Sequence, residues 1–194
     1  IMKKKMLVKI LNIGSFAILF IPLIGTNGLA FPFITGKAFT FRIIIEILGG
    51  IWLILTIVDK KYRPKFSWIL ISILLFIGII TTADIFGINP YRSFWSDFER
   101  MDGLLNLLHF VLYFLILSTT LATEKLWNYF FNTTIGVSVT LSLLGLLQLG
   151  GIMKINTDAG RLDSTIGNAA YFGMYIILHI FLTFFMLIRW QGKR

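Results

Sequence analysis

The chain has 194 residues, of which 57% are hydrophobic and 14% charged, and its net charge at pH 7 is +9. A mean hydropathy of +0.84 is far above that of soluble domains and indicates an integral membrane protein. The absence of cysteine excludes disulfide frameworks, thiolate nucleophiles and cysteine-bound zinc, and with two histidines we expect neither a metal site nor a cofactor.

Six apolar segments are long enough to cross a bilayer as helices, which takes about 20 residues for about 30 Å of hydrocarbon. Runs such as "WILISILLFIGII" lack the alternation of barrel strands, so helices are expected. The first segment follows "MKKKMLVK" without a small-residue cleavage site, and we expect it to be retained. The chain shows no repeat and is predicted to be one all-α bundle over residues 1–194. The predicted spans are residues 6–24, 41–58, 67–83, 103–122, 127–149 and 168–188.

Basic residues are distributed unevenly over the connections between these segments. With the N-terminus in the cytoplasm, 12 of the 18 Lys and Arg residues lie on the cytoplasmic side, and seven of the nine acids lie outside. Because basic residues favour the cytoplasmic side, both termini are predicted to be cytoplasmic. The basic side suits anionic lipid headgroups. Nucleic acid is not an expected partner, because no basic stripe lies on a water-soluble face.

The connection "DIFGINPYRSFWSDFERMD", predicted to lie outside, leads into the fourth span. Ser96 and Glu99 have the spacing of a capping box, which predicts that this helix starts before the membrane does. Polar residues then recur at helical spacing on one stripe, which predicts that they face the bundle interior. In the alternative interpretation Glu99 and Asp102 lie among headgroups, while Asn106 and His109 form hydrogen bonds to a neighbouring helix. The stripe consists of Glu99, Asp102, Asn106, His109 and Tyr113.

The sixth span shows a similar arrangement after the connection "GGIMKINTDAGRLDSTIGN". Ser164 and Thr165 are candidate helix caps. His179 lies about three turns inside the helix, where an interhelical hydrogen bond is expected more often than catalysis. It shares a face with Asn168, Tyr171 and Tyr175.

Four arginines lie in the predicted outer layer, against the usual preference of basic residues for the cytoplasmic side. A guanidinium group binds two phosphate oxygens at once, and a helix N-terminus offers backbone donors to the same anion. The arginines could therefore hold a pyrophosphate, or they could pair with the seven outer acids. Arg42 and Glu46, four residues apart, are expected to neutralise each other. The four arginines are Arg42, Arg92, Arg100 and Arg161.

The stretches "NPYRSFWSDFERMDGLLNLLHF" and "GRLDSTIGNAAYFGMYIILHIFL" resemble the N-terminal half of bacterial O-antigen ligase-related membrane proteins. This family includes O-antigen ligases, O-antigen polymerases and protein O-oligosaccharyltransferases. The resemblance covers residues 31–185, and its sharpest motif is "R-x-x-S-T-x-G-N". The chain departs from the family at Ala169 and Ala170, where relatives usually continue with Pro-Asn.

The resemblance implies transfer of a glycan from an undecaprenyl pyrophosphate carrier to a lipid or protein acceptor, outside the bacterial plasma membrane. It implies no metal or nucleotide sugar. It makes Arg161 the best candidate for a pyrophosphate contact, followed by Arg92, Arg100 and Arg42. Supporting roles fall to Ser164, Thr165, Asn168 and Glu99.

Relatives have more helices and a late external loop with a histidine that is thought to deprotonate the acceptor. No catalytic residue is therefore expected within this chain, which we expect to be the N-terminal part of a longer enzyme and inactive alone. The alternative is a non-catalytic six-helix protein, a transporter or an assembly subunit, whose arginines balance acids. Against many carriers stands the absence of repeat symmetry.

Overall fold

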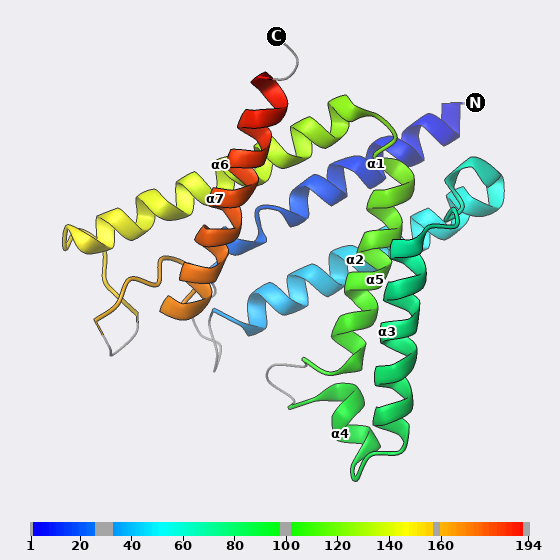
Figure 1. Cartoon of the computed structure of the whole chain (residues 1–194), viewed down its shortest axis with the longest axis horizontal. Coiled ribbons are helices and arrows are strands. Elements are labelled where there is room, and N and C mark those ends of the chain that lie inside the picture. Colours follow the sequence, from blue (N-terminus) through cyan, green and yellow to red (C-terminus); the bar gives the residue numbers. More distant parts are fainter. Residues whose placement is uncertain (1, 26–32, 98–101, 157–159, 192–194) are drawn as a thin grey trace. The chain divides into compact units, whose positions relative to one another are not determined.

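The computed structural model describes residues 2–25, 33–97, 102–156 and 160–191, and all regular structure in these ranges is helical (Figure 1). The chain is therefore all-α in its described parts, as predicted. The helices are α1 (Met2–Ile18), the 3-10 helix η1 (Ile21–Leu23), α2 (Thr35–Val58), the 3-10 helix η2 (Lys60–Tyr62), α3 (Trp68–Ile85), α4 (Pro90–Trp95), α5 (Leu104–Thr120), α6 (Glu124–Leu149) and α7 (Ala169–Gln191).

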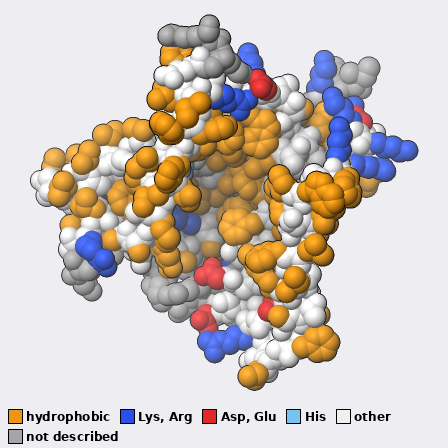
Figure 2. Space-filling model, viewed as in Figure 1, with side chains coloured by type: hydrophobic (Ala, Val, Ile, Leu, Met, Phe, Trp, Pro, Cys, Tyr) orange, Lys and Arg blue, Asp and Glu red, His pale blue; other side chains and the backbone are white. Residues whose placement is uncertain are grey.

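Four of the described helices, α2, α3, α6 and α7, are long and apolar enough to cross a membrane by length and composition, and α5 is a shorter apolar helix. Hydrophobic side chains lie along the outside of the helices in Figure 2. On α3 and α7 no residue is buried within the chain. Outward-facing apolar surface of this kind is typical of helices that contact lipid or other membrane helices.

Each of the six predicted segments overlaps a long helix of the described residues, and the main differences are the following. The first helix ends at Ile18, four residues before Pro22, because proline cannot donate the backbone hydrogen bond and clashes with the preceding turn. The second begins at Thr35 rather than residue 41, since the polar residues of "TGKAFT" lower the hydropathy without breaking the helix. The short helix α4 was not predicted.

Contacts divide the chain into two compact units, of which unit 1 comprises residues 1–18 and 38–122. Helix α5 is central to unit 1, because α1, α3, α4 and η2 all pack against it. Its core includes the fully buried side chains of Leu11, Ile45, Leu55 and Ile116. At one end of this unit Lys4 pairs with Asp59, which joins the start of α1 to the basic η2 segment.

Two glycines allow the helices of unit 1 to approach closely. A Cβ atom on Gly14 would lie 2.5 Å from Leu48 Cδ2, and one on Gly49 would lie 2.7 Å from Leu112 Cδ2. Small residues at such positions are the usual means by which membrane helices pack tightly. Polar bonds add to this packing, since Trp52 Nε1 donates to Thr119 Oγ1 at 2.9 Å.

Unit 2 comprises residues 19–37 and 123–194, and within it α6 packs against α7 and η1. A Cβ atom on Gly145 of α6 would lie 3.1 Å from the Phe172 ring of α7, so the two helices approach closely there. Near their other ends the rings of Phe131 and Phe185 meet edge to face at 6.4 Å. The connection between α6 and α7 is anchored to both α6 and η1, as described below.

Candidate functional site

Helix α4 begins and ends at residues suited to a tight turn. Asn89 caps it by accepting from the backbone N–H of Arg92 at 3.1 Å, and Pro90 occupies the first turn, where no N–H is needed. The helix ends at Ser96, whose φ of 62° lies in the left-handed region that costs a non-glycine residue energy. This reversal turns the chain back toward Arg92.

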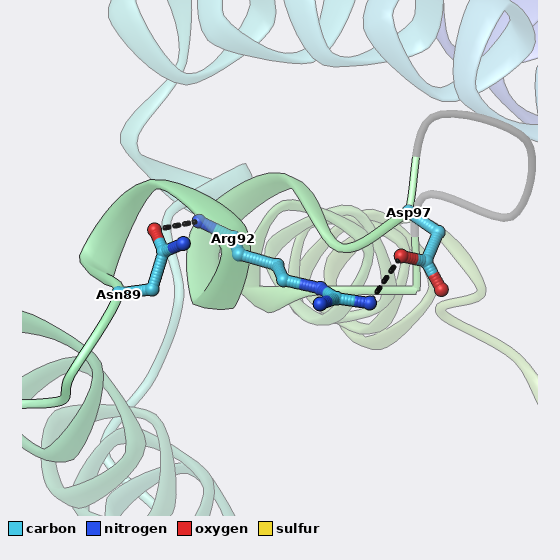
Figure 3. A network of polar contacts seen from close by, with 3 residues as sticks. All are labelled: Asn89, Arg92 and Asp97. Carbon is cyan, nitrogen blue, oxygen red and sulfur yellow. Dashed lines mark hydrogen bonds and ion pairs between the residues drawn. The ribbon is translucent and has the colours of Figure 1, made fainter.

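Arg92 lies in a shallow hollow of about 550 Å³ formed by the α4 segment and the start of α5. Its Nη2 atom donates to Asp97 Oδ1 at 2.8 Å (Figure 3). The two side chains are 69% and 61% exposed, and such surface pairs contribute only about 0–1 kcal/mol, so an anion can displace Asp97 at little cost. The hollow is lined by Ile88, Asn89, Arg92, Ser93, Ser96, Asp97 and Gly103.

The predicted capping box at the start of the fourth span is not the cap of α5. Ser96 is the C-cap of α4, and α5 starts at Leu104 with Gly103 as its N-cap. A Cβ atom on Gly103 would lie 2.5 Å from the carbonyl oxygens of Ser93 and Phe94, so only glycine fits this contact. The predicted site residues Glu99 and Arg100 lie outside the described residues.

Arg42 lies inside unit 1 rather than on an open surface. It is 5% exposed, and its guanidinium carbon lies 6.0 Å from the centre of the Phe39 ring. The carboxylates of Asp102 and Glu46 both interact electrostatically with it. The expected neutralisation of Arg42 by Glu46 is thus part of a larger charged group, which leaves Arg42 a poor candidate for direct contact with a pyrophosphate.

The loop that contains Arg161 is held by a buried carboxylate. Asp163 is fully buried, and its Oδ1 accepts from Gln148 Nε2 on α6 at 2.8 Å. Gln148 Oε1 in turn accepts from the backbone N–H groups of Asp163 at 3.2 Å and Ser164 at 2.8 Å. The Asn156 backbone N–H donates to Asp163 Oδ2 at 3.2 Å. One amide side chain therefore fixes the loop to α6, with Arg161 exposed at its edge.

The last helix is capped by Asn168 and not by the predicted caps Ser164 and Thr165. Its Oδ1 accepts from the backbone N–H groups of Ala170 at 2.9 Å and Tyr171 at 3.2 Å. Ser164 instead donates to the Leu141 carbonyl at 2.9 Å, and Thr165 donates to the Pro22 carbonyl at 2.8 Å. Both hydroxyls are therefore used to attach the loop to the rest of unit 2.

Pattern analysis of the sequence did not identify three residues that hold the loop region, namely Gln148, Asp163 and Lys37. The ammonium group of Lys37 donates to the Thr165 carbonyl. An amide within the apolar run "LLGLLQLG" was the available signal, because a polar group at that depth needs a partner. Arg161, Ser164, Thr165 and Asn168 all belong to unit 2, whereas Arg42 and Arg92 belong to unit 1.

The polar stripes predicted on two helices face neighbouring helices in part. On α5, His109 is buried against Glu46 of α2, and Tyr113 donates to the Ser15 carbonyl of α1 at 3.0 Å. On α7, the Nε2 atom of His179 lies 2.9 Å from Thr134 Oγ1 of α6. The interhelical hydrogen bonds expected for His179, and for His109 in the alternative interpretation, are therefore present.

No protein-family model, curated protein or solved structure matches the chain. The resemblance to O-antigen ligase-related proteins stays a prediction.

Proposed function

We propose that the chain supplies the pyrophosphate-binding part of a transferase of the O-antigen ligase type, which moves a glycan from a polyprenyl pyrophosphate carrier to an acceptor outside the membrane. The observation that carries the proposal is the Arg92 hollow. There an exposed guanidinium lies beside the hydroxyl residues Ser93 and Ser96 and is held only by a weak surface pair. Guanidinium and hydroxyl donors suit a phosphate anion.

The membrane arrangement proposed for this function has six spans with both termini in the cytoplasm. The helices α1 and α5, of 17 residues each, are about 26 Å long, close to the thickness of the hydrocarbon layer. Within unit 1 the basic residues of α1 and η2 gather at the same end, as the Lys4–Asp59 pair requires. This end suits the cytoplasmic face.

The Arg161 loop is the second part of the proposal. Its attachment through Asp163 and Gln148 gives the loop a fixed conformation without any ligand, and preorganised donors lose less entropy when they bind. Arg161 and the capped start of α7 lie on this same loop.

The first test measures binding of inorganic pyrophosphate and of a short-chain polyprenyl pyrophosphate to the purified chain by calorimetry. Arg92→Ala is expected to weaken binding about 10- to 100-fold, the usual worth of a hydrogen bond to a charged group. Asp97→Asn should keep or raise the affinity, because it removes the competing carboxylate. Arg63→Ala, an exposed arginine near η2 that donates to the Thr56 carbonyl, is the matched control.

The second test uses Arg161→Ala in the complete enzyme. Glycan transfer is expected to be lost while membrane insertion stays intact. Unchanged transfer would remove Arg161 from the proposed site, and unchanged pyrophosphate binding by Arg92→Ala would remove the hollow.

A non-catalytic membrane protein is the second candidate. It is favoured by the carboxylates near Arg92 and Arg42, which already balance part of the charge of these two arginines. Failure of the wild-type chain to bind either pyrophosphate probe would favour this candidate.

A further inference from the structure

Glu46 occupies the middle of α2, a candidate membrane span. The helix runs from Thr35 to Val58, so Glu46 lies 11 residues after its first residue and 12 before its last. An ionised carboxylate at the centre of a span costs several kcal/mol unless it is paired, and such residues usually belong to ion or proton pathways. The position of Glu46 therefore calls for a specific partner.

The partner is His109 on α5. Its Nε2 atom lies 3.2 Å from Glu46 Oε1, and its Nδ1 atom lies 2.7 Å from the carbonyl oxygen of Leu105, one turn earlier. The imidazole side chain is only 9% exposed, whereas the Glu46 side chain is 66% exposed. Both ring nitrogens thus face oxygen atoms.

The chemistry of these oxygens determines the number of protons. A carbonyl oxygen only accepts, so Nδ1 must carry a proton. A carboxylate also only accepts, so the contact between Nε2 and Oε1 requires one further proton, on either atom. With the proton on Oε1 both groups are neutral, and with the proton on Nε2 they form an imidazolium–carboxylate pair. Both forms have zero net charge and differ by a proton shift along one hydrogen bond.

Other polar groups continue from this pair in both directions. Arg42, one turn before Glu46, interacts electrostatically with Glu46 and with Asp102. On the other side, Tyr113, one turn after His109, donates to the Ser15 carbonyl at 3.0 Å. The Ser15 hydroxyl is buried and makes no hydrogen bond within the described part of the chain. Buried polar atoms of this kind commonly bind an internal water.

Charged groups on the elements around α5 are more exposed than Arg42, which is buried. They are exposed or half-buried, so solvent screens their effect on the pair. These groups are Lys4, Lys5 and Lys9 on α1, Lys60 and Lys61 on η2, Asp84 on α3 and Arg92 on α4.

We propose that Glu46 and His109 form a proton-exchange site within the membrane-spanning part of unit 1. The pair shares one proton between Glu46 Oε1 and His109 Nε2. Uptake of a second proton gives a carboxylic acid and an imidazolium ion, with net charge +1. Release of the shared proton gives a carboxylate and a neutral imidazole, with net charge −1. The site is separate from the Arg92 hollow and does not depend on the function proposed for it.

The test uses the chain in lipid bilayers with ¹⁵N-labelled histidine, because nitrogen chemical shifts distinguish protonated from unprotonated ring nitrogens. The chain has two histidines, so His179 serves as an internal reference. In Glu46→Gln the amide donates to Nε2, and His109 is expected to become a neutral ring protonated at Nδ1 alone. The His179 signals should not change. Glu124→Gln, which removes the acid paired with Arg189, should leave the His109 signals as in the wild type.

Infrared spectroscopy of the wild-type chain provides the second measurement. The shared proton is expected either as a Glu46 carboxylic acid band, absent in Glu46→Gln, or as an imidazolium signal of His109. The proposal fails if His109 Nε2 is unprotonated while Glu46 is a carboxylate, or if Glu46→Gln leaves the His109 signals unchanged. If Glu46→Gln does not fold, which loss of the His179 reference signals would reveal, the wild-type spectra decide alone.

Discussion

Each of the two units contains a histidine and a carboxylate with hydrogen-bond partners, but the partners differ between the units. Both contain a histidine whose Nδ1 bonds a carbonyl one turn earlier, at 2.7 Å in His109 and 2.8 Å in His179. In unit 1 the other ring nitrogen meets the carboxyl group of Glu46. In unit 2 it meets the hydroxyl of Thr134, and the buried carboxylate of Asp163 is surrounded by amide donors.

By donor and acceptor chemistry, the partner of each ring determines how many protons its hydrogen bonds need. A threonine hydroxyl can donate, so a neutral His179 satisfies both of its hydrogen bonds. A carboxylate cannot donate, so the His109 contact needs an additional proton. Asp163 is stabilised by N–H groups that never lose their protons near neutral pH. The hydrogen bonds of His179 and Asp163 therefore need no shared proton, whereas the contact between His109 and Glu46 does.

The largest effect on the free energy of unfolding is expected when Asp163 loses the amide of Gln148. Gln148→Leu leaves Asp163 buried without its main donor and should lower the free energy of unfolding by about 3–5 kcal/mol, as for a buried charge that loses its partner. Denaturant unfolding in detergent measures this, with the exposed Gln191→Leu as control. In the double variant Gln148→Leu/Asp163→Leu most of the loss should be recovered. A loss below about 1 kcal/mol would contradict the role given to Gln148.

A substitution in unit 2 should give His179 the same kind of partner that His109 has, a carboxylate. Thr134→Asp places a carboxylate opposite His179 Nε2, and the ring is expected to gain a proton that ¹⁵N shifts detect. Unpaired, an aspartate within a span costs about 2.5–3.5 kcal/mol, so the variant should also be less stable by up to that amount. Thr134→Val, which has neither donor nor acceptor, is the control. If His179 keeps one proton in Thr134→Asp, the rule drawn from the comparison is wrong.

Truncation of each histidine compares the two contacts directly. His109→Ala leaves Glu46 without its hydrogen bond and should cost about 1–3 kcal/mol. His179→Ala breaks a neutral contact between α6 and α7, where about 0.6 kcal/mol is the average for membrane helices, in addition to the lost packing. Double-mutant cycles with Glu46→Gln and Thr134→Val separate coupling from packing. Equal coupling energies in the two cycles would mean that the His109–Glu46 and His179–Thr134 contacts do not differ in strength.

The smallest effect is expected for the exposed pair in the Arg92 hollow. Asp97→Asn should change the free energy of unfolding by less than about 1 kcal/mol, since both side chains are largely in solvent. The same unfolding measurement applies, and salt should reduce the effect further. A larger loss would mean that the pair maintains the fold and is not available to an anion.

Hydropathy was sufficient to find the six long helices, because each is a nearly uninterrupted apolar run. It placed the start of α2 six residues late, and so placed Glu46 near the end of a helix whose middle it occupies. The helical spacing on α5 correctly predicted that His109 faces a neighbouring helix, and similar spacing did so for His179 on α7.

Contacts between residues far apart in the sequence were beyond the reach of pattern reasoning. Gln148 and Asp163 are 15 residues apart, and Thr165 bonds the Pro22 carbonyl over 143 positions. The capping pattern at Ser96 was misleading, because a serine that could cap a helix equally suits the left-handed turn that ends α4. The identity of the Glu46 partner likewise depended on how α2 and α5 pack, which composition does not encode.

The absence of a side chain at Gly103 has a mechanical consequence. With no space between this residue and the carbonyl oxygens at the end of α4, the start of α5 lies directly against the end of α4. A displacement of the start of α5 would therefore press directly on the backbone of Ser93 and Phe94, next to Arg92. Any bulkier residue at position 103 would force the start of α5 away from the end of α4.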